Sequence, residues 1–328
     1  MTRLARTIAV ISRLVLVLAL SGCSSVQEIL HPPYSQLPRL VSSPSIVFIS
    51  DTQAPLGIET LWQTYDDNEV ATEKIFEAIE RDTQCAAVFH LGDITAAGSI
   101  DSYWHGFDDA TQGLREAGIP LYPAFGNHEY MVVPGGGEEN TLRRFPFLSP
   151  SWYQRRIGSV AVLILNSNFS QLTPDERHAQ GEWYERTLRE LDADSSVAIV
   201  LVGCHHPPYT NSKVVEPDVE VQGKFVPAFI RSEKAQLFLS GHAHAFEHFR
   251  ISGKDFLVIG GAGGLLHPLL QGTDRRYEDL FVWQGERRFF HYVRLSIEQE
   301  TLSVNVMRLV DDKTSFEIAH ELRISLKR

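Results

Sequence analysis

The sequence predicts a layered α/β fold in which β-sheets pack against each other. From Pro44 onward, short apolar runs alternate with stretches of helical periodicity, a pattern typical of strands followed by helices. After Leu239 strand-like runs follow one another and helical stretches become rare. A hydrophobic content of 43% and a charged content of 22% are ordinary for a globular protein with a sizeable core. We therefore expect one folded domain over residues 44–328.

The expected strands are short and apolar. They cover residues 46–49, 86–89, 121–125, 160–165, 198–202 and 237–239, and then 256–259, 289–295, 302–309 and 316–324. Apolar residues at helical spacing predict helices around residues 70–79 and 104–114. A further helix should begin at Thr173, because Thr caps a helix, Pro174 suits its first position and acidic residues fill its first turn. The apolar residues that follow, from Trp183 to Leu191, are expected in the core rather than at a substrate.

The first residues do not belong to this domain. Three arginines precede a short apolar run over residues 14–20, and the tetrapeptide Leu20-Ser21-Gly22-Cys23 follows. A basic start, a short apolar run and small residues at a cleavage site are typical of a secretory signal. The tetrapeptide resembles the lipobox of bacterial lipoproteins, which implies that residues 1–22 are a lipoprotein signal peptide and that Cys23 is lipidated. Residues 23–43 would then comprise this lipidated Cys and a flexible tether.

The lipobox also implies a location. A lipid on Cys23 would hold the protein at a membrane surface of the bacterial cell envelope, facing the periplasm. Ser24 rather than Asp follows the Cys, which favours the outer membrane by the same resemblance. Because no run of 18 apolar residues is present, we expect no transmembrane helix in the mature chain.

Charge and cysteines narrow the class of protein. Residues 1–22 hold three arginines and no acid, so their removal leaves 27 basic and 41 acidic residues, and 27 − 41 gives a formal charge of −14. A surface this acidic repels polyanions, which argues against a nucleic-acid partner. Cys85 and Cys204 could pair in an oxidising compartment. Each lies beside an apolar strand, however, so we expect two separate buried thiols.

Polar signatures follow directly after five of the expected strands. They are Ser50-Asp51-Thr52-Gln53, Gly92-Asp93, Gly126-Asn127-His128-Glu129, Cys204-His205-His206-Pro207 and Gly241-His242-Ala243-His244. Each alone is compatible with a turn or a packed corner. Ligands commonly gather outside the carboxyl ends of strands in α/β sheets, so the whole series predicts one site. Carboxylate, amide and imidazole groups without thiolates suit Zn, Mn or Fe. Two such ions roughly 3.5–4 Å apart activate water and neutralise phosphoryl oxygens.

In this order the signatures resemble the calcineurin-like metallophosphoesterase superfamily, whose motifs are D-x-H, GD, GNH-D/E, a later His and G-H-x-H. The resemblance runs from about Ile46 to Gly264. The runs 205–209 and 241–247 are most similar to the purple acid phosphatase branch. The resemblance implies an α/β/β/α sandwich of two packed mixed β-sheets flanked by helices, with residues 44–328 as the catalytic domain. It also implies hydrolysis of small phosphomonoesters by a metal-bound hydroxide.

The same resemblance implies a role for each matching residue. Asp93 would bridge two divalent or trivalent metal ions (Fe, Mn or Zn). The ligands would be Asp51, His244 and Asp93 at the first ion, and Asn127, His205, His242 and Asp93 at the second. His206 is the alternative to His205, although the family places this ligand two residues before the Pro. His128 would be the catalytic residue that gives a proton to the leaving alkoxide or contacts the phosphate.

Two positions depart from the family pattern. Gln53 stands where the family has a His, and an amide oxygen binds a divalent metal more weakly than imidazole does. We therefore expect Gln53 to be a weak metal ligand or to leave the position to water. The purple branch has a Tyr three residues after the bridging Asp, where this chain has Ala96. The protein should therefore not be purple.

Several other residues near these motifs have both a functional and a structural interpretation. His90 would orient a ligand from behind or simply pack. His248 would approach the substrate, and Arg143 and Arg144 would reach its phosphate, or all three would be structural. The run Gly260–Gly264 lacks the context of a nucleotide loop, so we expect a tight turn near the site.

The alternatives to a phosphomonoesterase use the same residues. A phosphodiesterase or a pyrophosphate-cleaving hydrolase would share the metal centre, and only the lining beyond the metals would differ. A lipoprotein that binds through a degenerate metal site is the other alternative, and Gln53 is the one feature that favours it.

Overall fold

The computed structural model describes residues 34–55 and 66–326. The predicted signal peptide, Cys23 and the predicted tether up to residue 33 lie outside the described residues. Within the described ranges, no helix is long and apolar enough to cross a membrane.

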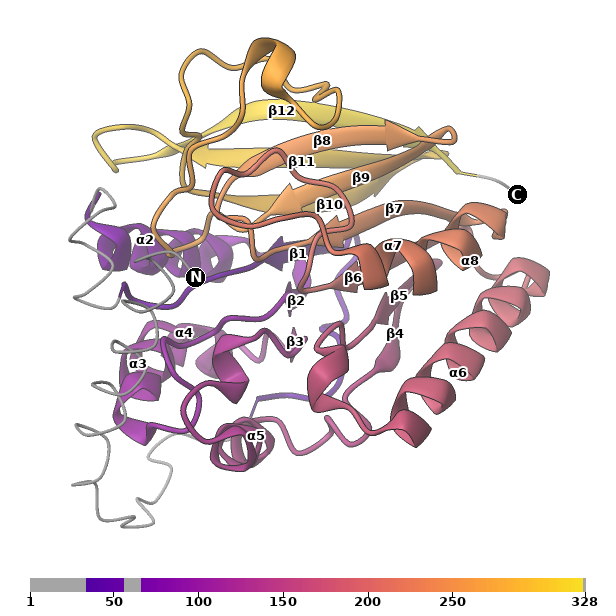
Figure 1. Cartoon of the computed structure of the whole chain (residues 1–328), viewed down its shortest axis with the longest axis horizontal. Helices are drawn as coiled ribbons and strands as arrows, with labels where there is room; N and C mark the ends of the chain where they lie inside the picture. Colours follow the sequence, from indigo (N-terminus) through magenta and orange to yellow (C-terminus); the bar gives the residue numbers. More distant parts are fainter. Residues whose placement is uncertain (1–33, 56–65, 327–328) are drawn as a thin grey trace, which may run out of the picture. The chain divides into compact units, whose positions relative to one another are not determined.

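The first of two six-stranded sheets has the strand order β12-β11-β10-β1-β2-β3 (Figure 1). Its strands are β1 (Ser45–Ile49), β2 (Cys85–His90), β3 (Leu121–Pro123), β10 (His291–Glu298), β11 (Thr301–Leu309) and β12 (Phe316–Ser325). The strands β1, β2 and β3 are parallel, whereas β10 runs antiparallel to β1. The carboxyl ends of β1, β2 and β3 therefore meet at one edge of this sheet.

The second sheet has the order β4-β5-β6-β7-β9-β8. Its strands are β4 (Tyr153–Ile157), β5 (Val160–Ile164), β6 (Ile199–Cys204), β7 (Ala235–Ser240), β8 (Phe246–Ile251) and β9 (Lys254–Ile259). The inner strands are parallel, and β4 and β8 are antiparallel at the two ends. Both sheets are therefore mixed, as expected.

The described helices are α2 (Asn68–Arg81), α3 (His105–Ala110), α4 (Gln112–Glu116), α5 (Pro134–Arg144), α6 (Pro174–Ala193), α7 (Val219–Lys224) and α8 (Val226–Arg231). Helix α6 begins as predicted. The Thr173 hydroxyl accepts the N–H of Glu176 at 3.2 Å, and the Glu176 carboxylate accepts the N–H of Thr173 at 2.8 Å. This reciprocal pair satisfies two backbone donors that a helix start leaves unpaired.

The core has two parts because side chains of a strand point alternately to opposite faces. In β6, Ile199 and Leu201 pack in the cluster that contains the first sheet, whereas Val200 and Val202 pack with the helices α6 and α8. Helices α2, α3 and α4 contribute to the first cluster from the other side of the first sheet (Figure 1). These packed layers are the predicted α/β/β/α sandwich of two mixed sheets flanked by helices.

Some elements were not predicted from the sequence. Strands β4 and β8 and helices α7 and α8 have no counterpart among the expected elements, and the predicted helix over 104–114 is divided at Thr111. Helix α5, which contains the run Gly135-Gly136-Gly137, was not predicted either. A Cβ at Gly137 would collide with the carbonyl of Glu129. Close packing therefore stabilises a helix here that glycine disfavours intrinsically.

Described residues before the predicted boundary at Pro44, from Tyr34 onward, also contact the domain. Tyr34 is buried, its ring lies 5.0 Å from that of Phe145, and its hydroxyl lies 2.5 Å from the Thr111 hydroxyl. The backbone N–H of Arg39 donates to the Ala86 carbonyl of strand β2 at 2.9 Å. The described part of the predicted tether, residues 34–43, is therefore not a free linker, because an aromatic anchor and a backbone bond fix it to the domain.

The two cysteines of the domain are separate. Cys85 and Cys204 are both buried free thiols, one in each sheet. The expectation of two unpaired thiols is confirmed.

Candidate metal centre

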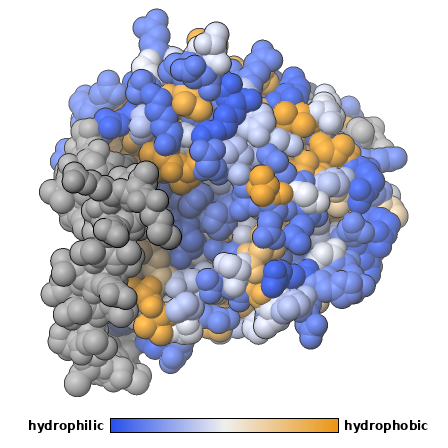
Figure 2. Space-filling model, viewed as in Figure 1, coloured by the Kyte–Doolittle hydropathy of each residue, from blue (hydrophilic) through white to orange (hydrophobic). Residues whose placement is uncertain are grey.

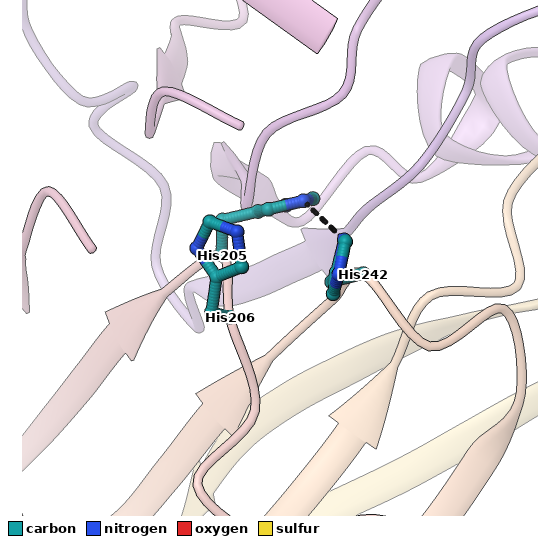
Figure 3. Close-up of side chains that lie close together, drawn as sticks. All are labelled: His205, His206 and His242. Carbon is teal, nitrogen blue, oxygen red and sulfur yellow. Dashed lines mark hydrogen bonds between the residues drawn. The ribbon is translucent and has the colours of Figure 1, made fainter. Parts of the chain in front are cut away.

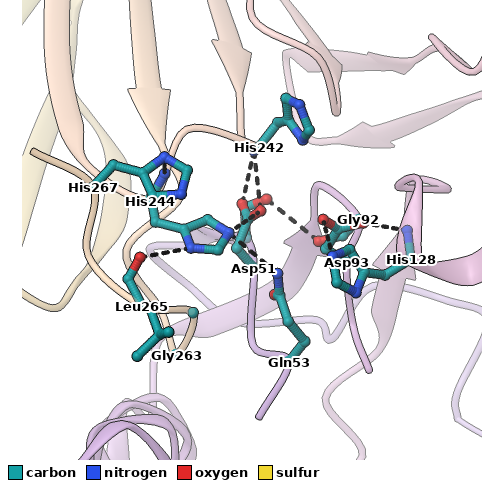
Figure 4. Close-up of polar contacts among 12 residues, drawn as sticks. Asp51, Gln53, Gly92, Asp93, His128, His242, His244, Gly263, Leu265 and His267 are labelled. Carbon is teal, nitrogen blue, oxygen red and sulfur yellow. Dashed lines mark hydrogen bonds and ion pairs between the residues drawn. The ribbon is translucent and has the colours of Figure 1, made fainter. Parts of the chain in front are cut away.

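The five polar signatures meet where the carboxyl ends of strands from both sheets face each other (Figures 3 and 4). Asp51 follows β1 and Asp93 follows β2, while His205 and His242 follow β6 and β7. Bonds between these loops hold them together. The backbone N–H of His242 donates to both oxygens of Asp51 at 3.1 and 3.0 Å, and the N–H of His128 donates to Asp93 Oδ1 at 2.8 Å.

One group of donor atoms consists of Asp51, Asp93 and His244, whose ligand atoms lie within 4.8 Å of one another. His244 Nε2 lies 3.3 Å from Asp51 Oδ1, and His244 Nδ1 lies 2.9 Å from the Leu265 carbonyl. The carbonyl accepts the proton of Nδ1, so Nε2 is left with a lone pair that faces the carboxylates. Gln53 Nε2 lies 3.1 Å from the same Nε2.

A second group is centred on His205 (Figure 3). His205 Nε2 lies 3.2 Å from Asp93 Oδ2, 3.1 Å from Asn127 Oδ1 and 3.2 Å from His242 Nδ1. Its Nδ1 lies 2.9 Å from the Leu91 carbonyl, which fixes the ring orientation. Asp93 therefore lies between the two groups, as a bridging carboxylate must.

His206 is less well placed than His205 to be the ligand, although the ligand atoms of His205, His206 and His242 also form a group. The Nδ1 of His206 lies 2.9 Å from the Ser167 hydroxyl, and its ring lies 4.7 Å from that of His242. No hydrogen bond or ion pair joins it to Asp93 or Asn127 among the described residues. The geometry favours His205, the residue that the sequence also favoured.

Backbone strain marks three of these positions. Asp51, Asp93 and His242 have φ values of 63°, 54° and 63°, a left-handed conformation that residues other than glycine rarely adopt. Strain of this kind persists where surrounding structure over-determines it, most often at functional sites. Glycines make the close approach possible, because a Cβ at Gly126 would collide with the Asp93 carboxylate and one at Gly241 with that of Asp51.

The buried carboxylate of Glu129 organises the loop of Asp93, a role that the sequence did not reveal. It accepts the N–H groups of Asp93 at 2.9 Å, Ile94 at 2.8 Å and Gly126 at 2.7 Å. Burial and the neighbouring Asp93 charge raise the pKa of Glu129 to about 7. The signal for this role was present in the acidic residue that follows Gly126-Asn127-His128.

His90 supports the site from behind rather than simply packing. Its Nε2 lies 2.9 Å from the Thr52 hydroxyl, and its Nδ1 accepts the N–H of Gly92 at 3.2 Å. Burial lowers the pKa of His90 to about 3, so the ring is neutral and can accept this bond. It thereby joins the loops of Asp51 and Asp93.

Electrostatics keep the central carboxylate ionised. Burial by itself would raise the pKa of Asp93, but the adjacent His205 and His128 rings lower it well below the ordinary value. Burial would lower the pKa of His205, yet the Asp93 charge raises it to about 9. Burial and the neighbouring imidazoles hold the pKa of His242 well below 6.5. The Asp93 carboxylate thus favours a positive charge on His205, whereas the neutral His242 ring offers a lone pair.

A cavity of about 140 Å³ opens over these groups. It is lined by Gln53, Pro55, Asp93, His128, Val214, Val215, His242, His244, Gly264, Leu265 and His267. His128 is fixed at its rim, since its Nδ1 lies 2.7 Å from the Ala96 carbonyl and its Nε2 lies 3.8 Å from Asp93 Oδ2. His267, which no sequence motif indicated, stacks on His244 with ring centroids 4.3 Å apart. Burial and the neighbouring His244 and His242 hold its pKa well below 6.5.

The Gly-rich run lies against this cavity, as predicted. The N–H of Gly264 donates to the Asp51 carbonyl at 2.8 Å, and a Cβ at Gly264 would collide with the His244 ring. The run therefore lets the backbone pass directly behind two donor residues.

For three residues that had both a functional and a structural interpretation, the structural one holds. His248 is buried away from the site, where its Nε2 lies 2.9 Å from Asp255 and its Nδ1 lies 3.0 Å from His320. Arg144 is buried in a bidentate pair with Asp108, which neutralises it. Arg143 lies beside Asp101 and Glu139. The two arginines pair with these acids and hold α5 in place, so neither arginine reaches a phosphate in the cavity.

The donor set fits a pair of metal ions. Two buried carboxylates, an amide oxygen and three imidazole nitrogens converge, and the buried Gln53 Oε1 has no hydrogen-bond partner in the described part of the chain. Buried anions and orphaned polar atoms are costly unless they are paired or coordinate metal. Oxygen and imidazole donors without thiolates suit Zn, Mn or Fe.

The sequence and the fold of this chain are similar to those of known proteins. The chain is 27% identical over 150 residues to the phosphoenolpyruvate phosphatase of Allium cepa, a match that covers 42% of this chain and 30% of the onion protein. Its fold is similar to that of a purple acid phosphatase from yellow lupin (Lupinus luteus) seeds, with a TM-score of 0.63, 18% identity and coverage of 89% of this chain and 55% of the lupin chain. It is also similar to GAP50, the anchor in the inner membrane complex of Plasmodium, with a TM-score of 0.66, 12% identity and coverage of 87% and 90%.

This chain thus spans less than two thirds of the onion and lupin proteins that it matches. A comparison with models of protein families gives a further match. Residues 44–246, which carry all five polar signatures, match the calcineurin-like phosphoesterase family. The chain belongs to the calcineurin-like phosphoesterase family.

Proposed function

We propose that the protein hydrolyses phosphomonoesters at a dinuclear metal centre. The observation that carries this proposal is the position of Asp93. Its carboxylate lies between the Asp51–His244 group and the His205–Asn127–His242 group, so that it can serve both. Asp51, His244 and Asp93 would hold one ion, and Asn127, His205, His242 and Asp93 the other. When bound, such a pair supplies a nucleophile from water and neutralises the phosphoryl oxygens.

The side chains of the protein complete the chemistry. The Ala96 carbonyl accepts the hydrogen of His128 Nδ1, which turns Nε2 toward the cavity. In the charged ring Nε2 carries the proton that a leaving alkoxide requires, and this atom lies 3.8 Å from Asp93 Oδ2. Glu129 and His90 keep the Asp93 loop in place while charge shifts during the reaction.

The shape of the cavity supports monoesters. A volume of about 140 Å³ admits one phosphoryl group and leaves the remainder of a substrate at the rim. A diester needs room for organic groups on two sides of the phosphorus atom. A pyrophosphate needs cations for its second phosphate, but no Lys or Arg is found among the described residues that line the cavity. Nearby Lys213 and Arg276 are paired with Glu286 and Glu216.

We also propose that the enzyme acts at the bacterial cell envelope. The support is the sequence alone, namely the apolar run over residues 14–20 and the lipobox that ends at Cys23. A lipid on Cys23 would tether the domain to a membrane surface.

One assay tests the proposed activity. The full chain, loaded with Mn²⁺, Zn²⁺ or Fe, is incubated with p-nitrophenyl phosphate, bis(p-nitrophenyl) phosphate and inorganic pyrophosphate. We expect turnover of the monoester above both others and its loss by at least about 100-fold in Asp93→Ala, because removing a bridging ligand costs more than the 10–100-fold typical of outer partners. Asp175→Ala, which alters an exposed acid of α6, is the control. Absence of turnover with every metal, or equal activity in Asp93→Ala, would refute the proposal.

A further inference from the structure

We infer that His267 is a substrate-contacting residue whose Nε2–H donates a hydrogen bond to a phosphoryl oxygen in the cavity. The inference rests on the proposed function, because it concerns the same cavity and the same substrate class. It adds a binding residue on the side of the cavity formed by His244, across from His128 (Figure 4).

His267 is held rigidly in this position. Its ring is 4% exposed and lies nearly parallel to that of His244, with an angle of 20° between the planes. The backbone N–H of His267 donates to the His244 carbonyl at 2.9 Å. The residue thus moves as one unit with the His244 segment, and it follows the Gly-rich run that passes behind the site.

The hydrogen bonds of Nδ1 determine which ring nitrogen carries the hydrogen. The backbone N–H of His244 donates a hydrogen bond to His267 Nδ1 at 3.2 Å. A backbone N–H can only donate, so Nδ1 is the acceptor and carries no hydrogen. A neutral imidazole has one donor and one acceptor nitrogen, and the hydrogen therefore resides on Nε2.

Ser212 reinforces this arrangement. Its hydroxyl oxygen accepts the N–H groups of Val214 at 3.1 Å and Val215 at 3.2 Å, and the same oxygen lies 3.2 Å from His267 Nδ1. Because the lone pairs of the hydroxyl are used by the two backbone donors, its own hydrogen is available to Nδ1. The His244 N–H and the Ser212 hydroxyl thus both donate to Nδ1, and the hydrogen of the ring therefore lies on Nε2.

Within residues 34–55 and 66–326 the hydrogen bonds of the His267 ring are those of Nδ1, and none is made by Nε2. A fixed N–H donor in a cavity that is built for an anion calls for an oxygen from the ligand. No lysine or arginine is found among the described residues that line the cavity, so none of them can bind this oxygen instead. Nε2 is also not placed to bind a metal ion, because it carries a hydrogen and His267 is not part of either group of converging ligand atoms.

The test compares His267→Ala, His267→Gln and the control His178→Ala, which alters an exposed histidine on α6. Each full-length, metal-loaded protein is analysed for metal content, for binding of inorganic phosphate by calorimetry, and for KM and kcat with p-nitrophenyl phosphate. We expect His267→Ala to weaken phosphate binding about tenfold or more, as loss of a hydrogen bond to a charged group does. Its metal content should stay equal to that of the native chain. The Gln amide N–H lies near the position of Nε2, so His267→Gln should recover most of the affinity.

Three results would overturn the inference: unchanged phosphate affinity in His267→Ala, loss of metal in that variant, or no recovery in His267→Gln. Phosphate binding is measured without turnover, so this failure is distinguishable from failure of the proposed function. A native chain that binds phosphate through His267 but cleaves no phosphomonoester would refute the proposed function and support the contact.

Discussion

The carboxylate of Glu129 accepts the backbone N–H of Asp93 at 2.9 Å, and the same carboxylate holds the N–H groups of Ile94 and Gly126. One buried side chain therefore fixes the loop of Asp93, the proposed bridging carboxylate, and the loop of Asn127 relative to each other. Because Asp93 has a φ of 54°, which is strained for a residue other than glycine, this loop needs such support.

Glu129→Ala should destabilise the fold and weaken metal binding together. Three buried N–H groups would lose their acceptor, and each unsatisfied donor costs about 1–3 kcal/mol before water enters. We expect the free energy of unfolding, measured by urea titration, to fall by about 3 kcal/mol or more. Glu138→Ala alters an exposed acid nearby and should leave stability within about 0.5 kcal/mol of the native value. Native stability in Glu129→Ala would contradict this account of the loop.

His205 and His206 should differ sharply in their effect on metal binding. His205 Nε2 faces Asp93 and Asn127, whereas His206 uses Nδ1 for Ser167. We expect His205→Ala to lose one metal ion per chain in elemental analysis and His206→Ala to keep the native content. A reversed pattern would make His206 the ligand, and equal losses would show that both bind.

Glu247 should make the stability of the fold depend on pH. Burial raises its pKa from 4.5 to about 7, although hydrogen bonds from the Thr210 hydroxyl and the Asn211 N–H oppose the shift. A folded pKa above the unfolded one means that the stabilisation is complete below pH 4.5 and is lost as the pH rises through 7. The loss is about 3 kcal/mol for this one carboxyl group.

Glu247→Gln removes that titration. Urea unfolding between pH 4.5 and 8 should therefore show a flatter profile for Glu247→Gln, with a stability above that of the native chain at pH 8. The control Glu182→Gln alters an exposed acid of α6 and should retain the native slope. If Glu247→Gln kept the native slope as well, another group would be responsible for the pH dependence.

Tyr34 should contribute to stability although it lies in the predicted tether. Its ring stacks on Phe145, the Arg115 guanidinium lies 4.9 Å from its centroid, and its hydroxyl reaches Thr111. Tyr34→Ala should lower the free energy of unfolding by about 2–4 kcal/mol, in the range of buried large-to-small substitutions. Tyr34→Phe should retain most of the packing and lose only the hydroxyl contacts. Thermal unfolding indistinguishable from native in Tyr34→Ala would mean that residues 34–43 are dispensable.

The strands, and the candidate ligand residues that the fold brings together, could be predicted from the sequence because both are marked by local patterns. An apolar run identifies a strand by itself, and Asp51, Asp93 and His242 each follow such a run directly. Helix α6 could also be predicted from the sequence, because Thr173 and Pro174 mark its start. The elements that were missed depend on distant partners. Helix α5 contains three glycines and is held by contacts of Gly137 with Glu129 and of Arg144 with Asp108.

The supporting residues of the site were harder to predict for the same reason. His267 lies 23 residues after His244 in the chain, and only the fold stacks the two rings. His248 shows that a histidine close to a motif in the sequence can lie outside the site. It stands next to the G-H-x-H motif, but strand β8 carries it away from the cavity to Asp255. Proximity in the sequence is therefore a poor guide to which histidines share a site.

The central claim is that Asp93 joins two metal sites, and metal stoichiometry tests it most directly. The full chain and its Asp93→Ala and Asp175→Ala variants are dialysed against excess Mn²⁺ or Zn²⁺, and the bound metal per chain is measured by plasma mass spectrometry. We predict two ions per chain for the native protein and for Asp175→Ala, and one or fewer for Asp93→Ala. A native chain that saturates with fewer than two ions, or an Asp93→Ala variant that retains two, would contradict the dinuclear centre.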